Sequence, residues 1–321
     1  MKNKIDRTFE LPLVSVVVAT YNSSATIVET LESIKRQTYQ NVELIVTDDC
    51  SMDDTVSIVE EWVAINRTRF VNVKNVFSNV NTGVACNANR GVKASKGVFV
   101  KSIAGDDCLV DEAIEKYVSF MLSTENVICV SDVELFSVNH AIPDAKITSY
   151  KRCFELCKEN REAKLRRLAY EYVLLSPGYF YSRELFDKIG GYDERFPMSE
   201  EVPFAMRVLK AGYDIIPFDE KLVRYRYSGV SLSQHYGKKL GNRRWFLDNR
   251  KIYYRIQMPE LLKSFRFLSA YSKMIQYEQT NLQYFNGILP RIGEKFLCML
   301  NPYTYYSLIL KFRKNNETKI M

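Results

Sequence analysis

The sequence is poor in histidine and has no paired cysteine motif. Its 321 residues include two histidines, and its seven cysteines are scattered without any C-x-x-C pair. Structural zinc sites and disulfide frameworks both need clusters of such residues. The lack of these clusters argues against both kinds of site, and we expect free thiols in a reducing compartment.

Long apolar runs and phosphate-binding glycine loops are also missing. No stretch approaches the roughly 18 uninterrupted apolar residues that a membrane-spanning helix needs. The segment from Met1 to Glu10 is polar and lacks the apolar centre of a signal peptide, so we expect a cytoplasmic protein. Neither G-x-x-x-x-G-K nor G-x-G-x-x-G occurs, which argues against a P-loop or dinucleotide-binding enzyme.

Positive charge is abundant but unevenly placed. The net charge is +7, and residues 235–321 hold 16 Lys and Arg against 5 Asp and Glu. The rest of the chain therefore carries a net charge of −4. Such a division predicts no nucleic-acid partner over the whole surface. It favours a localised anionic partner of the basic end, such as an anionic membrane surface.

Apolar strand-like segments alternate with amphipathic helical segments over the first two thirds of the chain. Strands are expected near residues 13–19, 42–47, 70–77 and 98–103, with helices between them. This alternation predicts an α/β fold with a mostly parallel, Rossmann-like sheet flanked by helices. We expect this domain to span residues 1–234 and a basic, aromatic helical extension to span residues 235–321, with helices at 242–256, 259–285 and 291–313.

Two of the expected strands run directly into pairs of aspartates. Asp48 and Asp49 follow the second strand, and Asp106 and Asp107 follow the fourth. Ligands bind at the carboxyl ends of the strands in open α/β sheets. Carboxylates gathered there repel one another unless a positive group lies between them. The pattern predicts a site for a metal-bound phosphate compound.

These segments resemble, in order, the motifs of the inverting family 2 glycosyltransferases, which have the GT-A fold. The similar segments are Val14–Asn22, Asp48–Thr55, Asn81–Gly83, Asn89–Gly91, Gly190–Glu194, Glu200–Glu201 and Tyr225–Arg226. Each segment alone is weak evidence, whereas the ordered set is highly specific. The resemblance covers about two thirds of the chain and implies transfer of a sugar from a nucleotide-diphosphosugar, with a UDP-sugar as the expected donor.

The resemblance implies a set of residues that bind this donor. They are Thr20, Tyr21, Asn22, Asp48, Asp49, Asn89, Asp106 and Arg226. The carboxylate of Asp48 would accept hydrogen bonds from the base and the ribose. An acid after a strand also fits the start of a helix, where the helix dipole favours it, so a purely structural role of Asp48 and Asp49 stays open. Arg226 fits a diphosphate contact and a surface strand position equally well.

Asp106 and Asp107 are the expected ligands of a Mg²⁺ or Mn²⁺ cofactor. Family members usually have D-x-D, whose first position is Ala104 in this chain. The x-Gly-Asp-Asp form occurs in a subgroup, and the resemblance places the direct metal bond on Asp106. A hard cation needs few protein carboxylates because phosphates and waters complete its coordination.

Glu201 is the expected general base, with Glu200 as the alternative. The resemblance places Glu-Asp here, and its aspartate falls on Glu201, which is one methylene longer. Direct attack by a deprotonated acceptor hydroxyl inverts the anomeric carbon and requires one base and no enzyme nucleophile. Both acids also stand at an expected helix start, where the dipole alone would favour them.

The resemblance and the basic extension together imply an acceptor and a location. The acceptor is expected to be a hydroxyl of a polysaccharide or of a lipid-linked oligosaccharide. The extension would lie on the inner face of the plasma membrane, with Lys295, Lys311, Arg313 and Lys314 as the best candidates for contact with anionic lipid. A helical cap and an oligomer contact remain open for the extension. Ala104 and Glu201 leave open a second function, that of a catalytically silent nucleotide-sugar or glycan-binding protein.

Overall fold

The computed structural model describes residues 11–124, 126–170, 176–228, 243–264, 266–284 and 288–302. The chain divides into two compact units. The first comprises Met1–Leu165 and Val173–Gly229, and the second comprises Arg166–Tyr172 and Val230–Met321.

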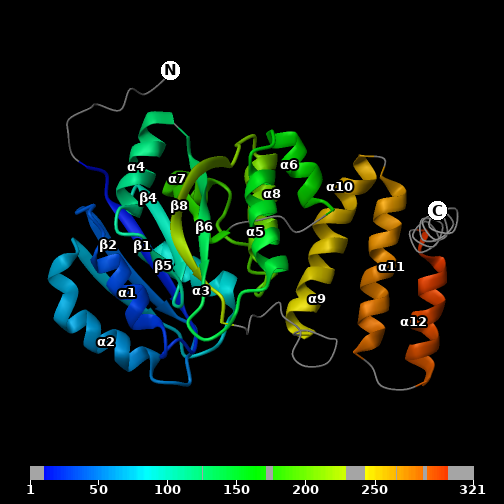
Figure 1. Ribbon diagram of the computed structural model, residues 1–321, viewed down its shortest axis with the longest axis horizontal. Helices are drawn as coiled ribbons and strands as arrows, with labels where there is room; N and C mark the ends of the chain where they lie inside the picture. The colour runs from blue at the N-terminus through cyan, green and yellow to red at the C-terminus, as the bar shows by residue number, and fades with distance from the viewer. Residues whose placement is uncertain are drawn as a thin grey trace, which may run out of the picture. The chain divides into compact units, whose positions relative to one another are not determined.

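The first unit is built around an eight-stranded sheet with the order β3-β2-β1-β4-β7-β6-β8-β5 (Figure 1). The strands are β1 (Val14–Thr20), β2 (Val42–Asp48), β3 (Asn72–Phe77), β4 (Phe99–Ala104), β5 (Cys108–Leu109), β6 (Ile128–Phe136), β7 (Tyr179–Ser182) and β8 (Ile216–Arg226). Strands β3, β2, β1 and β4 are parallel, β7 runs antiparallel to β4 and β6, and β5 runs antiparallel to β8. Strands β6 and β8 are also parallel, so the predicted α/β fold with a mostly parallel sheet flanked by helices is confirmed, and the reversals come from β7 and β5.

Helices of the first unit cover this sheet. They are α1 (Ile27–Lys35), α2 (Thr55–Asn66), α3 (Val84–Ala94), α4 (Ala113–Thr124), α5 (Asp144–Cys157), α6 (Arg161–Leu168, which runs into the second unit), α7 (Arg183–Lys188) and α8 (Glu201–Lys210). Helix α3 packs on β1 and β2, while α1 and α2 lie against each other (Figure 1). Gly91 makes the close approach of α3 possible, since a Cβ there would lie 2.5 Å from Val17 Cγ1.

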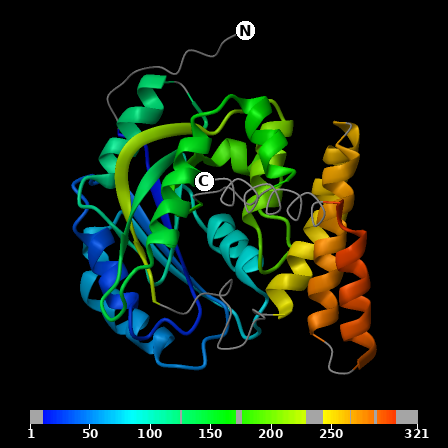
Figure 2. The same ribbon diagram turned by 45° about the vertical axis from the view of Figure 1, so that its right-hand side comes forward.

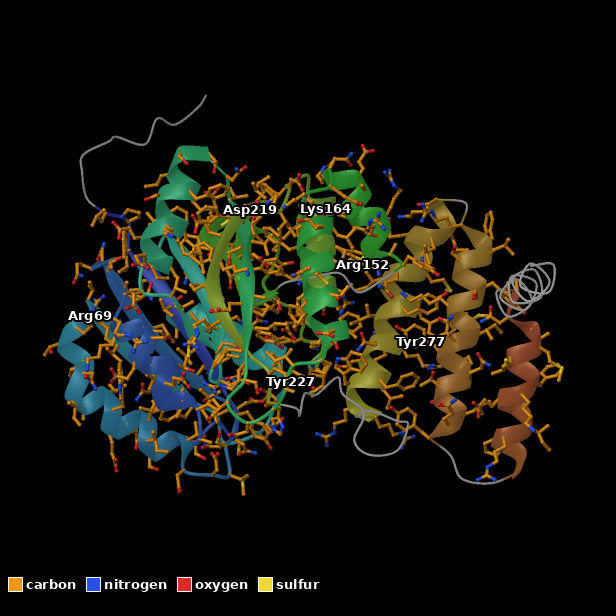
Figure 3. The ribbon with its side chains drawn as sticks, in the orientation of Figure 1. Arg69, Arg152, Lys164, Asp219, Tyr227 and Tyr277 are labelled. Carbon is orange, nitrogen blue, oxygen red and sulfur yellow. The ribbon has the colours of Figure 1, made fainter. Side chains whose placement is uncertain are left out.

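Buried apolar side chains and a few polar anchors hold the sheet and its connections. Strands β1 and β2 are almost completely buried, as expected for parallel strands covered on both faces. Arg69, labelled in Figure 3, donates hydrogen bonds of 2.6–2.9 Å to the carbonyl oxygens of Lys35, Gln37 and Tyr39. The turn before β3 is thereby tied to the connection between α1 and β2.

The described helices of the second unit are α9 (Arg243–Ile252), α10 (Met258–Lys263), α11 (Phe267–Gln283) and α12 (Ile288–Leu300). Helices α11 and α12 run side by side (Figure 2), and Gln283 Nε2 donates to Glu294 Oε1 at 2.5 Å. The expected helices at 242–256 and 259–285 are not separated at Pro259, because the chain stays helical there. A π-helical turn, Tyr253–Gln257, precedes Met258 and Pro259, so Pro259 falls in the first turn of α10, where proline is tolerated.

Candidate active site

Strand register brings both acid pairs to one edge of the sheet. Thr20 at the end of β1 is paired with Asp48 at the end of β2, and Ala19 is paired with Ala104 at the end of β4. Asp49 and the Gly105–Asp107 segment continue directly from these strand ends. The predicted gathering of carboxylates at the carboxyl ends of the parallel strands is thus present.

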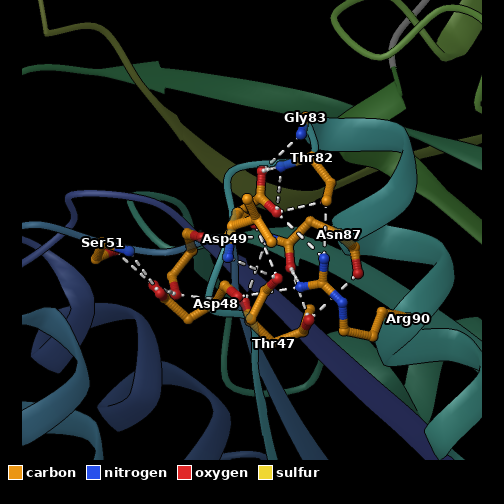
Figure 4. Close-up of polar contacts among 11 residues, drawn as sticks. Thr47, Asp48, Asp49, Ser51, Thr82, Gly83, Asn87 and Arg90 are labelled. Carbon is orange, nitrogen blue, oxygen red and sulfur yellow. Dashed lines mark hydrogen bonds and ion pairs between the residues drawn. The ribbon is translucent and has the colours of Figure 1, made fainter.

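Asp48 is buried, and three donors of the protein contact its carboxylate (Figure 4). The hydroxyl of Thr20 donates to Oδ2 at 2.7 Å, and Ser51 donates from its main-chain N–H at 2.8 Å and from its hydroxyl at 2.5 Å. Helix α2 begins only at Thr55, so Ser51 does not cap this helix. Ser51 instead fixes the orientation of the Asp48 carboxylate beside the end of β1.

Asp49 is held even more completely, by the start of α3 (Figure 4). Its carboxylate accepts from the Thr82 N–H and hydroxyl, from the Gly83 N–H at 2.6 Å, and from Arg90 at 3.2 Å. Gly83 has φ = +94°, and a Cβ there would lie 2.5 Å from Pro197 Cβ, so only glycine fits this turn. With four donors from the protein, the Asp49 carboxylate anchors the connection into α3.

The loop after β1 is tied to the loop after β2. The main-chain N–H of Asn22 donates to Ser51 Oγ at 2.8 Å, and Asn22 Oδ1 accepts from the Met52 N–H at 2.8 Å. Asn22 and Cys50 both have left-handed backbone conformations, with φ of 50° and 67°. Such conformations are rare outside glycine and concentrate at functional sites. Tyr21, between these anchored positions, has a side chain that is 49% exposed.

Asn89 is a buried residue of α3 that contacts the loop preceding α8. Its Oδ1 accepts from the Tyr192 N–H at 2.8 Å, and its amide donates to the Tyr192 carbonyl and to Glu194, each at 2.9 Å. The predicted donor-binding role of Asn89 stays a prediction. The contacts of the amide group make it a positioning side chain for the Tyr192–Glu194 loop.

The second acid pair differs strongly in exposure. Asp107 is 1% exposed, and its Oδ1 accepts from the Arg226 N–H at 2.9 Å. Asp106 is half-buried, and among the described residues its carboxylate accepts a hydrogen bond only from its own main-chain N–H. Burial raises the pKa of both carboxyl groups, and the neighbouring Asp106 carboxylate raises that of Asp107 further.

The guanidinium group of Arg226 contacts other groups of the protein. Nε donates to the Asp106 carbonyl at 2.7 Å, Nη2 pairs with Glu29, and the guanidinium carbon lies 4.5 Å from the Phe136 ring centroid. The side chain is 9% exposed. The predicted diphosphate contact of Arg226 stays a prediction, whereas its present contacts fix the position of the Asp106–Asp107 turn.

The second acid pair is also where a divalent cation would bind. Across the described ranges, no three His, Cys, Asp or Glu side chains come together as a metal cluster. Asp106 nevertheless fits a hard cation, because its carboxylate is half-buried and, among the residues that the structure describes, accepts a hydrogen bond only from its own N–H. Asp107 is occupied by Arg226 and fits less well as a direct ligand.

Glu200 and Glu201 lie at the start of α8, as predicted, but the helix dipole is not the main influence on the pKa values of their carboxyl groups. Burial raises the pKa of Glu200, and it raises that of Glu201 from 4.5 to about 7. A helix dipole would lower both values, by an amount worth about 1 kcal/mol or less. Burial therefore dominates, and a carboxyl group with a pKa near 7 is well suited to general-base catalysis near neutral pH.

Two residues near Glu201, Ser176 and Tyr150, are not among those that the sequence predicts for the site. The hydroxyl of Ser176 donates to Glu201 Oε1. Tyr150 of α5 and Tyr225 of β8 have ring centroids 5.3 Å apart. Burial raises the pKa of both tyrosines most, and the Glu201 and Asp107 carboxylates raise these pKa values further. These tyrosines thus lie near both the expected base and the second acid pair. The sequence signals for this region are Tyr225, which lies in a segment similar to the family, and Lys101, a charged residue within an otherwise apolar strand pattern.

Comparison with known proteins decides the family. The model of glycosyl transferase family 2 matches residues 15–190, which is more than half of the chain. The chain belongs to glycosyl transferase family 2. One relative from Escherichia coli is 38% identical to this chain over 117 residues. It is named UDP-Glc:alpha-D-GlcNAc-diphosphoundecaprenol beta-1,3-glucosyltransferase WfaP. That match covers 36% of this chain and 44% of the relative, so the chain spans less than half of its length.

Solved structures agree with this family member in fold. S. aureus TarS 1–349 in complex with UDP-GlcNAc has a TM-score of 0.58 at 18% identity, with 92% of each chain covered. The mannosyltransferase PcManGT from Pyrobaculum calidifontis, in complex with GDP-Man and Mn²⁺, has a TM-score of 0.52 at 16% identity and covers 92% of this chain and 72% of its own. At such identities the likeness establishes the fold alone.

Proposed function

We propose that this family 2 chain is an inverting, metal-assisted glycosyltransferase that uses a nucleotide-diphosphosugar, with a UDP-sugar as the expected donor. One observation carries the proposal. At the edge where the parallel strands end, the Asp49 and Asp107 carboxylates are held by protein donors, while the half-buried Asp106 carboxylate accepts only from its own main chain within the described residues. That arrangement leaves Asp106 for a ligand.

The nucleoside end of the donor would lie between the loops that follow β1 and β2. Thr20 and Ser51 orient the Asp48 carboxylate, whose remaining lone pairs can accept from the base and the ribose. Tyr21 and Asn22, which directly follow β1, would contact the nucleoside from the other loop. The UDP-GlcNAc complex of TarS, a protein of the same fold, supports a uridine donor for this chain.

The diphosphate would bind at Asp106. The Asp106 carboxylate would hold Mg²⁺ or Mn²⁺, which would supply Lewis-acid stabilisation of the leaving diphosphate. Asp106 is carried on a turn that Arg226 fixes through its Nε and its main-chain N–H. The x-Gly-Asp-Asp form, with Ala104 in place of the first aspartate, therefore concentrates cation binding on one side chain. The Mn²⁺ complex of PcManGT supports this cofactor class.

Glu201 is the proposed base, with Glu200 next to it on the same helix start. The Glu201 carboxylate would take the proton of the acceptor hydroxyl as that oxygen attacks the anomeric carbon from the side opposite the diphosphate. The pKa of about 7 matches this role, because the group is both ionised in part and basic enough near neutral pH.

The acceptor class rests on the relatives and on the second unit. WfaP is named as a transferase to a diphosphoundecaprenol-linked sugar, which supports a lipid-linked or polysaccharide acceptor. Among the described residues, no helix combines the length and apolarity needed to cross a bilayer. Helix α12 exposes Ile292, Phe296 and Met299 beside the exposed Lys295, a composition suited to an anionic membrane surface. The remaining lipid-contact candidates, Lys311, Arg313 and Lys314, lie outside the described residues.

The proposal is tested by incubating the protein with a panel of UDP-sugars, Mn²⁺ and an undecaprenol-diphosphate-linked sugar acceptor. We expect one of the UDP-sugars to be consumed. NMR of the product should show that the new glycosidic bond has the anomeric configuration opposite to that of the donor. Glu201→Gln should retain donor binding and lose transfer by roughly 10²–10⁴-fold. Retention of configuration would contradict the single-base mechanism, and full activity of Glu201→Gln would remove this residue from it.

A silent sugar- or nucleotide-binding protein is the second candidate. Ala104 and the longer Glu201 side chain favour it, because both depart from the D-x-D and Glu-Asp motifs that the family usually has. Detectable transfer by the wild-type protein that Asp106→Ala abolishes would exclude this candidate.

A further inference from the structure

Lys101 is a lysine that the proposed chemistry does not use, and it is completely buried in β4. Its Nζ donates to the carbonyl oxygens of Pro177 and of Tyr179, the latter at 3.1 Å. Burial lowers the pKa of this amine to about 7. Burying a lysine is costly unless its hydrogen bonds are satisfied. An apolar residue would fill the same position in a strand without that cost.

The two carbonyl groups belong to one short segment, the turn Ser176–Gly178 and the first residue of β7. Other buried residues also contact the same turn. The Tyr117 hydroxyl lies 3.1 Å from the Gly178 carbonyl, to which it donates, and 2.6 Å from Ser131 Oγ. A Cβ on Gly178 would lie 2.2 Å from the Ser131 carbonyl, so the turn sits directly on β6. Lys101 and Tyr117 thus clamp this turn from β4 and α4.

The turn carries Ser176, and the Ser176 hydroxyl donates to Glu201. The strand that carries Lys101 also leads to Asp106 and Asp107. The contacts of Lys101 therefore connect β4, which leads to Asp106 and Asp107, with the Ser176 hydroxyl, which donates to Glu201, the expected base. A hydrogen bond donated to a carboxylate favours its ionised form and fixes its direction.

We propose that Lys101 is a positioning residue for Glu201: it holds the Ser176–Gly178 turn on β4 and so keeps the Ser176 hydroxyl on the Glu201 carboxylate. The inference rests on the proposed function in so far as Glu201 is the base. The geometric link itself, from Lys101 through Ser176 to Glu201, can be measured without any transfer reaction.

The other titratable groups near the two ends of this link limit what a test can show. Glu201 is faced by Glu200 on its own helix, by Tyr150 of α5 and by Tyr225 of β8. Lys101 is faced by Asp107, by Cys129 of β6 and by Tyr117 of α4. Each comparison must therefore isolate Glu201, which a paired Glu201→Gln variant in every background does.

The experiment measures the pH dependence of the stability difference between each protein and its Glu201→Gln counterpart, by urea unfolding. The pH at which that difference stops changing reports the folded-state pKa of Glu201. We expect Ser176→Ala to move it upward by about one pH unit. Lys101→Met, which removes the amine and keeps the stem, should move it by a similar amount, and the double variant should move it no further.

Two further variants keep the test decisive. Tyr117→Phe serves if Lys101→Met does not fold. It removes only one of the hydroxyls that contact the turn and should shift the Glu201 pKa in the same direction by a smaller amount. Lys164→Met is the matched control, since Lys164 is also a buried lysine, 2.8 Å from Asp214 beyond the far end of α8. It should lower stability without moving the Glu201 value.

An unchanged Glu201 value in Lys101→Met and Tyr117→Phe, or shifts that add to that of Ser176→Ala, would overturn the inference. A different result would overturn the proposed function alone: full transfer by Glu201→Gln while the Lys101 and Ser176 shifts are present. If both hold, the pH profile of transfer should shift upward in Lys101→Met with the donor dissociation constant unchanged.

Discussion

The main-chain N–H of Arg226 donates to the Asp107 carboxylate across 2.9 Å, and the side chain of the same arginine donates to the Asp106 carbonyl across 2.7 Å. One residue at the end of β8 therefore fixes the turn that carries both aspartates. We expect Arg226→Lys, which loses the side-chain bond, to weaken UDP binding in the presence of Mn²⁺ by about tenfold, the equivalent of one hydrogen bond.

Glu29→Gln provides the matched control for this prediction. Glu29 pairs with Arg226, but its side chain is 46% exposed, so the ion pair contributes little. Calorimetric titration should show less than about a threefold change in UDP affinity for this variant. Equal effects of the two variants would show that the Arg226 contacts to the turn are not what matters.

Asp49 should matter for stability. Asp49→Ala leaves the N–H groups of Thr82 and Gly83 and the Arg90 side chain without their acceptor, and we expect a loss of about 2–4 kcal/mol in the free energy of unfolding. Asp54→Ala, an exposed acid in the same loop, should change that free energy by less than about 0.5 kcal/mol. Urea unfolding curves of the two variants test the difference, and similar losses would contradict the anchoring role.

Glu201 makes stability depend on pH. Its pKa is about 7 in the folded protein and near 4.5 once unfolded, so between these values the folded state binds more protons and stability falls as pH rises. Compared with Glu201→Gln, the wild-type protein should lose about 3 kcal/mol on going from pH 4.5 to pH 8. Unfolding of both proteins at several pH values measures this loss. A constant difference between them would contradict the raised pKa.

The second unit should bind anionic lipid. We expect vesicles that contain phosphatidylglycerol to sediment several-fold more protein than phosphatidylcholine vesicles, with the difference lost at high salt. Lys295→Gln on α12 should reduce this binding, whereas Lys263→Gln, an exposed lysine on α10, should leave it unchanged. Equal binding to both kinds of vesicle would favour a cap or oligomer role of the extension.

The sequence predicts the edge of the sheet where the candidate site lies. It does not predict which acids at that edge are held by protein donors and which is left for a ligand. Apolar runs that end in Asp48 and Asp106 identify buried parallel strands, and parallel strands share one carboxyl edge. Which acid of each pair is held by the protein depends on distant partners. Asp107 meets Arg226 across 119 residues of chain, and Asp49 meets Gly83 across 34. No local pattern encodes such contacts.

The second half of the sheet and the surroundings of Glu201 show the same limit. The four-residue β7 is too short for periodicity to give its direction, and its antiparallel pairing follows from packing against β4 and β6. Burial around Glu201 likewise arises from elements far apart in sequence, so its pKa of about 7 has no signature in the residues that flank it.

The most direct test of the account is calorimetric titration of UDP into the wild-type protein, Asp106→Ala and Asp107→Asn, each with and without Mn²⁺. We predict Mn²⁺-dependent binding in the wild-type protein, its loss in Asp106→Ala, and affinity within about threefold of wild type in Asp107→Asn, whose side-chain oxygen can still accept from Arg226. Unchanged Mn²⁺-dependent binding in Asp106→Ala would contradict the central claim.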